Sequence, residues 1–178
     1  MKTAHLVCWL LVLACDASAH RLDEYLQATR VSVTTNRIDL SLELTPGVAI
    51  ADQLLAITDK NRDGQISDGE RDAYARQVLK DIRVELDNKV LALSLADTSF
   101  PAHHEIKAGV GIIRIKATVP IASLSVGNHT LSLTNAHLPA ISVYLVNVLT
   151  PKDRAIKITK QTRDELQKDY HLEFAVGP

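Results

Sequence analysis

The chain has 178 residues, with 20 Lys and Arg against 21 Asp and Glu, a net charge of −1 and 46% hydrophobic residues. This length and composition are typical of one globular domain and exclude a disordered or fibrous chain. Because the charges balance, the chain offers no basic field for a phosphate backbone, and the composition disfavours nucleic-acid binding.

The first nineteen residues have the three parts of a secretory signal peptide. Lys2 supplies the positive start, an apolar run extends from Ala4 to Ala14, and Ala17-Ser18-Ala19 is a small-residue cleavage site. The run is shorter than the roughly 20 apolar residues that span a bilayer. We therefore expect an exported domain at 20–178, periplasmic or extracellular, with no transmembrane segment in the mature chain.

A second route of processing stays open. The segment Val12-Leu13-Ala14-Cys15 is similar to a lipoprotein box, in which Cys15 would be acylated and would anchor the chain. Cleavage after Ala19 would instead remove both cysteines, Cys8 and Cys15. The exported domain could then form no disulfide, so an aliphatic core and a bound ion are the expected sources of its stability.

Alternation of apolar and polar residues predicts β-strands over most of the exported part. The first hairpin pairs 28–34 with 37–44, and the second pairs 82–86 with 90–95. Further strands are predicted at 111–119, 129–134, 142–149, 156–161 and 170–176. About nine short strands at this spacing predict an antiparallel sandwich or an open barrel.

One segment between the second and third strands has helical spacing instead. Apolar residues recur at this period over 50–57 and again over 68–82. The second helix is predicted to bury one face, formed by Tyr74, Val78, Leu79 and Ile82. The predicted fold class is therefore α+β, an antiparallel β-sandwich-like domain with a single helix-loop-helix inserted at 50–82.

The loop between the two helices carries oxygen ligands at calcium-binding spacing. Its twelve residues, DKNRDGQISDGE, fit the template D-x-[DN]-x-[DN]-G-x5-E at every required position. Ca²⁺ is a hard cation that takes about six to eight oxygens, and loop positions 1, 3, 5, 7 and 12 provide them. The predicted ligands are the side chains of Asp59, Asn61, Asp63 and Glu70 and the backbone carbonyl of Gln65.

An interpretation without metal is also available for these residues. Asp-x-Asn-x-Asp-Gly is common turn chemistry, and Ser67 followed by Glu70 is a capping box that can start the second helix. Gly64 stands where the loop must turn sharply, and Ile66 is predicted to point into the helix-pair core. A full match by chance is expected in on the order of one in a thousand chains of this length. Calcium binding is therefore favoured, and capping can coexist with it.

The helix-loop-helix resembles the EF-hand family over about 30 residues, from Ile50 to Asp81. The resemblance implies a calcium-binding unit. EF-hands usually work in pairs, and no second loop of this kind is present, so either the rest of the domain supports the loop or the affinity is weaker. We expect a Kd of roughly 10⁻⁴ to 10⁻³ M and a calcium ion that acts mainly as a structural clamp.

Two other segments, HRLDEYLQA at 20–28 and ISVYLVN at 141–147, resemble the exported N-terminal region of HupE/UreJ-type bacterial membrane proteins. Those proteins continue into several transmembrane helices and are linked to nickel or hydrogenase accessory roles. The resemblance therefore implies a membrane protein partner.

An alternative function follows from the histidines. If His20 becomes the N-terminus, its imidazole and its α-amino group could chelate nickel or copper. The site would be completed by one of His103, His104, His129 and His137, although His103-His104 is expected to be an exposed loop pair.

Catalytic motifs are missing from the sequence. It has no G-x-S-x-G, no H-E-x-x-H and no phosphate-binding glycine loop, and the exported part has no cysteine nucleophile. No catalytic residue is predicted, and the expected function is binding rather than catalysis.

Overall fold

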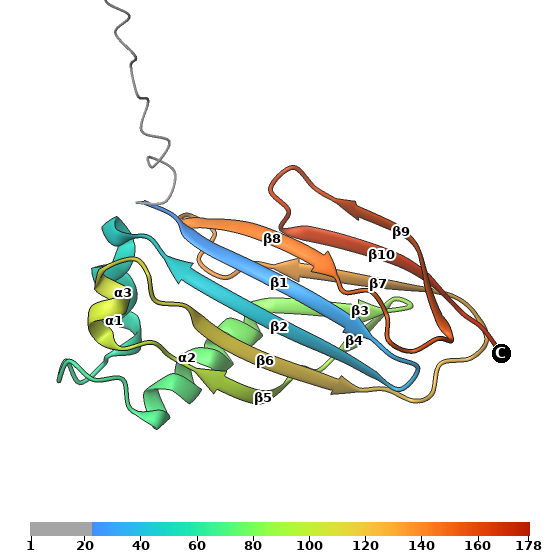
Figure 1. Ribbon diagram of the computed structural model, residues 1–178, viewed down its shortest axis with the longest axis horizontal. Coiled ribbons are helices and arrows are strands. Elements are labelled where there is room, and N and C mark those ends of the chain that lie inside the picture. The colour runs from blue at the N-terminus through green and yellow to red at the C-terminus, as the bar shows by residue number, and fades with distance from the viewer. Residues whose placement is uncertain (1–22) are drawn as a thin grey trace, which may run out of the picture.

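A computed structural model describes residues 23–178 of the chain, so the predicted signal peptide, Cys15 and His20 lie outside the described residues. Two five-stranded sheets make up most of the described part (Figure 1). In spatial order, the first sheet contains β5 (Ser94–Ser99), β6 (Ile113–Pro120), β2 (Arg37–Pro46), β1 (Tyr25–Val33) and β8 (Ser142–Val148). The second contains β4 (Lys89–Leu91), β3 (Ile82–Leu86), β7 (Gly127–Asn135), β10 (Asp169–Val176) and β9 (Ile156–Arg163).

The apolar faces of the two sheets share one hydrophobic core. In β2 the buried positions alternate with polar ones, so that Leu40 and Leu42 point inward while Ser41 does not. From the second sheet, Leu172 and Phe174 of β10 enter the same buried cluster. Burying each large apolar side chain stabilises the fold by about 1.5–3 kcal/mol. The fold is thus mostly β, with two largely antiparallel sheets and few helices, as the strand pattern predicts.

Strand pairing differs from the sequence prediction at two places. Strand β8 runs parallel to β1, with Leu26 opposite Val143, so the first sheet is not wholly antiparallel. The predicted strand 90–95 is divided, because β4 pairs with β3 whereas β5 pairs with β6 in the other sheet. The alternation of exposed and half-buried residues continues from β4 into β5, so the pattern does not reveal the change of sheet. A two-residue period shows which face of a strand a side chain occupies but not which strand lies beside it.

Three α-helices gather at the end of the sheets where β1 begins, and the C-terminus lies at the opposite end (Figure 1). A 3-10 turn, η2 (Val48–Ile50), leads into α1 (Ala51–Thr58), which is followed by α2 (Asp68–Lys80). Two helices lie between β2 and β3, as predicted. The second buries Tyr74, Val78 and Leu79 of its predicted apolar face, whereas Ile82 is buried as the first residue of β3. None of the helices within 23–178 has the length and apolar character needed to cross a membrane.

A third helix, α3 (His103–Lys107), was not predicted. The expectation of an exposed loop pair at His103-His104 was wrong, because these residues form the first turn of α3. The Glu105 carboxylate accepts the Ala102 N–H at 2.7 Å, and the side chain of Ile106 is fully buried. One side-chain hydrogen bond and one core contact therefore order a segment that its sequence alone indicates to be a loop.

Candidate metal site

The first predicted ligand is held by the end of a packed helix. Asp59 directly follows α1 and donates its N–H to the Leu55 carbonyl at 2.8 Å. Thr58 Oγ1 donates to the Leu54 carbonyl at 3.1 Å, and Leu54 and Leu55 both belong to the hydrophobic core. The backbone at Asp59 is therefore fixed by core packing rather than by the loop itself.

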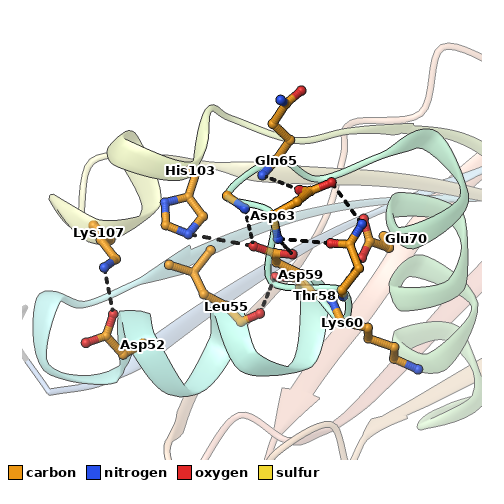
Figure 2. A network of polar contacts seen from close by, with 12 residues as sticks. Asp52, Leu55, Thr58, Asp59, Lys60, Asp63, Gln65, Glu70, His103 and Lys107 are labelled. Carbon is orange, nitrogen blue, oxygen red and sulfur yellow. Dashed lines mark hydrogen bonds and ion pairs between the residues drawn. The ribbon is translucent and has the colours of Figure 1, made fainter.

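Three of the predicted ligands lie close together and are held by neighbouring hydrogen-bond donors, and Figure 2 shows Asp59 and Asp63 among them. The Asp63 N–H lies 3.2 Å from Asp59 Oδ1 and 3.2 Å from Asn61 Oδ1. The Gly64 N–H donates to Asp59 Oδ2 at 3.0 Å, and Asn61 Nδ2 donates to Asp63 Oδ2 at 2.8 Å. Side-chain oxygens from loop positions 1, 3 and 5 therefore lie on one side of the loop.

Gly64 and Gln65 complete the turn. Gly64 has a φ of +79°, in the left-handed region that a residue with a side chain adopts only at a cost, which confirms the predicted sharp turn. The Gln65 N–H donates to Asp63 Oδ1 at 2.8 Å, and in Figure 2 the Gln65 side chain points away from the carboxylates. Its backbone carbonyl thus remains the group of Gln65 suited to a ligand role. Ile66 next to it is partly buried against the core, as predicted.

Glu70 joins the two ends of the loop. Its Oε1 accepts the Lys60 N–H at 2.8 Å, and its Oε2 accepts the Ser67 hydroxyl at 2.7 Å and the Ser67 N–H at 3.0 Å. The reciprocal bond from Glu70 N to Ser67 Oγ is 3.4 Å, which completes the predicted capping box at the start of α2. The hydrogen bond from the Ser67 hydroxyl lowers the pKa of Glu70 below its usual value.

The loop offers the oxygen atoms that a hard cation prefers, but its acidic side chains do not all converge on one point. In the described range 23–178, no group of three or more His, Cys, Asp or Glu side chains is placed to hold a metal ion. The reason lies in Glu70, whose carboxylate is occupied by backbone N–H groups and by Ser67, and in Asn61, which contributes an amide rather than a carboxylate. Carboxylate and amide oxygens are nevertheless the donors that Ca²⁺ takes in proteins.

Asp59 is the most buried acid of the loop. Only 5% of the residue is exposed, and its side-chain partners are the N–H groups of Asp63 and Gly64. His103 on α3 points toward it, with Nε2 at 4.0 Å from Asp59 Oδ2 (Figure 2). Burying a charge is costly unless it is paired, so Asp59 is the position in the loop where a cation would be stabilised most.

A buried chain of hydrogen bonds ties α2 to the sheets. Tyr25 OH on β1 lies 2.7 Å from Tyr74 OH on α2, and Tyr74 OH lies 3.0 Å from His137 Nε2. His137 Nδ1 lies 2.7 Å from Asp81 Oδ2, directly after α2. This cluster links residues 25, 74, 81 and 137, and the sequence analysis did not identify it.

The pKa shifts indicate where the protons of this chain lie. Burial lowers the pKa of His137, against the opposing hydrogen bond to Asp81, and burial raises the pKa of Tyr25 and of Tyr74. A neutral His137 that donates from Nδ1 to Asp81 must accept at Nε2, so Tyr74 donates to His137 and Tyr25 donates to Tyr74. In this arrangement every hydrogen bond from Tyr25 to Asp81 has one donor and one acceptor.

His129 lies in a different setting. Its Nδ1 is 2.7 Å from Asp87 Oδ2, its Nε2 is 2.9 Å from the Ser125 carbonyl, and its ring stacks on Phe174. The hydrogen bond to Asp87 raises the pKa of His129, and the bond to Ser125 adds to the shift. Both ring nitrogens of His129, like both of His137, are therefore already committed to protein partners.

Comparisons of this chain with protein-family models, with curated proteins and with solved structures find no match. The resemblances to EF-hand proteins and to HupE/UreJ-type proteins remain predictions from the sequence. The function is accordingly inferred from the loop residues and their surroundings.

Proposed function

We propose that residues 59–70 form an EF-hand loop that binds Ca²⁺, and that the ion acts mainly as a structural clamp. The observation that carries this proposal is that Asp59 and Asn61 side-chain oxygens meet at the Asp63 N–H, and that Asp63 Oδ1 accepts the nearby Gln65 N–H, next to the end of α1 where Asp59 is buried. The Gln65 carbonyl and the Glu70 carboxylate would complete a set of oxygen ligands that matches the preference of Ca²⁺.

The clamp follows from electrostatics and from the position of the loop. Carboxylates at Asp59, Asp63 and Glu70 repel one another, and a divalent cation removes that repulsion. The loop joins α1 to α2, which the Tyr74 hydrogen bonds attach to β1, so ordering the loop orders one end of the domain. At a calcium concentration of about ten times Kd, binding stabilises the folded state by about 1.4 kcal/mol. For a domain of this size we expect a melting temperature about 3–6 °C higher.

The test uses a variant that separates calcium binding from helix capping. Glu70→Gln loses the charge but keeps an N3 side chain that still serves in a capping box. Asp72→Asn is the matched control, because Asp72 is an exposed acid on α2 whose pair with Arg76, at 3.6 Å, contributes little. We expect calcium to raise the melting temperature of the wild type and of Asp72→Asn, but not of Glu70→Gln. Identical wild-type melting curves in calcium and in chelator would refute the clamp.

Transition-metal binding is the alternative function. It depends on His20, which lies outside the described residues. Among the histidines suggested to complete the site, His129 and His137 have both ring nitrogens hydrogen bonded to other protein groups. These nitrogens would have to leave their partners to bind nickel or copper, which favours calcium. Calorimetric titration with Ni²⁺, Cu²⁺ and Ca²⁺ distinguishes the two, since nickel or copper heat that survives Glu70→Gln and disappears in His20→Ala would support the alternative.

Export and a membrane protein partner are proposed on the basis of the sequence. The signal peptide at 1–19 supports export, and the HupE/UreJ-like segments support a partner in the membrane. Mass spectrometry of the exported protein would distinguish cleavage after Ala19 from acylation at Cys15.

A further inference from the structure

A short segment, residues 100–107, lies beside the metal loop, and we call it the platform. It begins directly after β5 and includes α3. Phe100 and His103 of the platform line one shallow depression, of about 350 Å³, together with Gly64 and Ile66 of the loop. His103 also lines a second depression with Asp59. The platform and the loop therefore face each other directly.

The platform is held rigidly. Ile106 is fully buried in the core, and the Glu105 carboxylate accepts the Ala102 N–H. Gly111, just after the platform, packs so closely that a Cβ there would lie 2.7 Å from Pro101 Cγ. Because contacts closer than about 3 Å do not occur for real side chains, only glycine allows this approach. The platform can thus support the loop as a fixed surface.

Three contacts connect the platform to the helix-loop-helix. The Phe100 ring meets the Tyr74 ring of α2 edge to face, with centroids 5.8 Å apart. Lys107 Nζ lies 3.4 Å from Asp52 Oδ1 on α1, and His103 Nε2 lies 4.0 Å from Asp59 Oδ2 (Figure 2). A single rigid segment therefore contacts both helices and the first predicted ligand.

We propose that the platform supports the calcium loop and that His103 is a positioning residue for Asp59. This inference rests on the proposed calcium binding. Asp59 must keep one orientation to serve as a ligand, and the His103 ring lies next to Asp59 Oδ2, the oxygen that also accepts the Gly64 N–H. A ligand that is ordered in advance loses less conformational freedom when the ion binds. Groups that orient metal ligands in this way typically change metal affinity by about 10–100-fold.

The experiment compares two neighbouring histidines in the full chain by calorimetric titration with CaCl₂. His103→Ala removes the contact to Asp59. His104→Ala is the matched control, because His104 is exposed and lines the same depression but makes no side-chain hydrogen bond or ion pair with residues 59–70. We expect His103→Ala to raise the calcium Kd roughly tenfold and His104→Ala to leave it unchanged. His103→Gln keeps a polar side chain of similar reach beside Asp59 and should restore most of the affinity. The melting temperatures in chelator should match among all the variants.

The outcomes are distinct for the two proposals. Equal Kd values for His103→Ala and His104→Ala, or tighter binding by His103→Ala, would overturn the positioning role while leaving calcium binding intact. A wild-type chain that gives no calcium heat and no calcium-dependent change in melting temperature would overturn the proposed function and the positioning role together.

Discussion

The buried chain of hydrogen bonds from Tyr25 to Asp81 predicts an order of mutational effects. Tyr74 donates to His137 and accepts from Tyr25, so Tyr74→Phe removes two hydrogen bonds at once. Tyr25 stands at the end of the chain, and Tyr25→Phe removes one bond while Tyr74 still donates to His137. We therefore expect Tyr74→Phe to destabilise the fold more than Tyr25→Phe.

The magnitudes follow from burial. Tyr25 and His137 are fully buried, so after Tyr74→Phe a hydroxyl and a ring nitrogen both lose their partner away from water. Each such buried unsatisfied group costs about 1–3 kcal/mol, which gives a loss near 3 kcal/mol for Tyr74→Phe. Tyr25→Phe leaves only one acceptor of Tyr74 unpaired, for about 1 kcal/mol. The corresponding decreases in melting temperature are about 6–12 °C and about 2–4 °C.

The assay is urea unfolding followed by circular dichroism, performed in chelator so that calcium does not contribute. Equal slopes of the unfolding free energy against urea concentration in the wild type and the two variants would show that the mutations change stability and not the compactness of the unfolded state. If Tyr25→Phe costs as much as Tyr74→Phe, Tyr74 does not join Tyr25 to His137 as the two distances indicate. A loss well below about 1 kcal/mol for Tyr74→Phe would show that the chain does not anchor α2.

Two further predictions concern pH and the loop. The hydrogen bond to Asp87 raises the pKa of His129 in the folded state. The contribution of His129 to stability is therefore complete below its unfolded pKa of about 6.5 and is lost as pH rises through its folded pKa. In unfolding measurements, His129→Gln should therefore lose more stability, relative to the wild type, at about pH 5 than at about pH 8, and an equal loss at both would contradict the pairing. A Cβ at position 64 would meet no atom within 4 Å, so the stability lost in Gly64→Ala should come from backbone strain alone. We expect a loss of about 1–2 kcal/mol, measured by urea unfolding in chelator. No loss would contradict a left-handed Gly64.

Local patterns in the sequence predicted much of the fold. The alternation along 37–44 corresponds to β2, and the helical spacing at 50–57 and 68–82 corresponds to α1 and α2. The turn at Gly64 and the capping box of Ser67 and Glu70 also have the predicted form. These features depend on residues within about one or two turns of chain, where side-chain chemistry and backbone geometry act directly on each other.

In the candidate site, too, only the features that depend on residues close together in the sequence follow the prediction. Loop spacing brings Asp59, Asn61 and Asp63 together, because neighbouring backbone N–H groups serve all three. The Glu70 side chain instead bonds to Lys60 and Ser67, an outcome that depends on competition between capping and ligation and that spacing cannot resolve.

Tertiary structure alone decided the remaining features. Tyr74 meets Tyr25 across 49 residues of chain and His137 across 63, and β8 pairs parallel to β1 from more than a hundred residues away. The contact of His103 with Asp59 depends on burying Ile106 and on the missing side chain of Gly111. Periodicity along a chain specifies which side of an element is apolar, whereas the neighbour of that side is chosen by packing of the whole core.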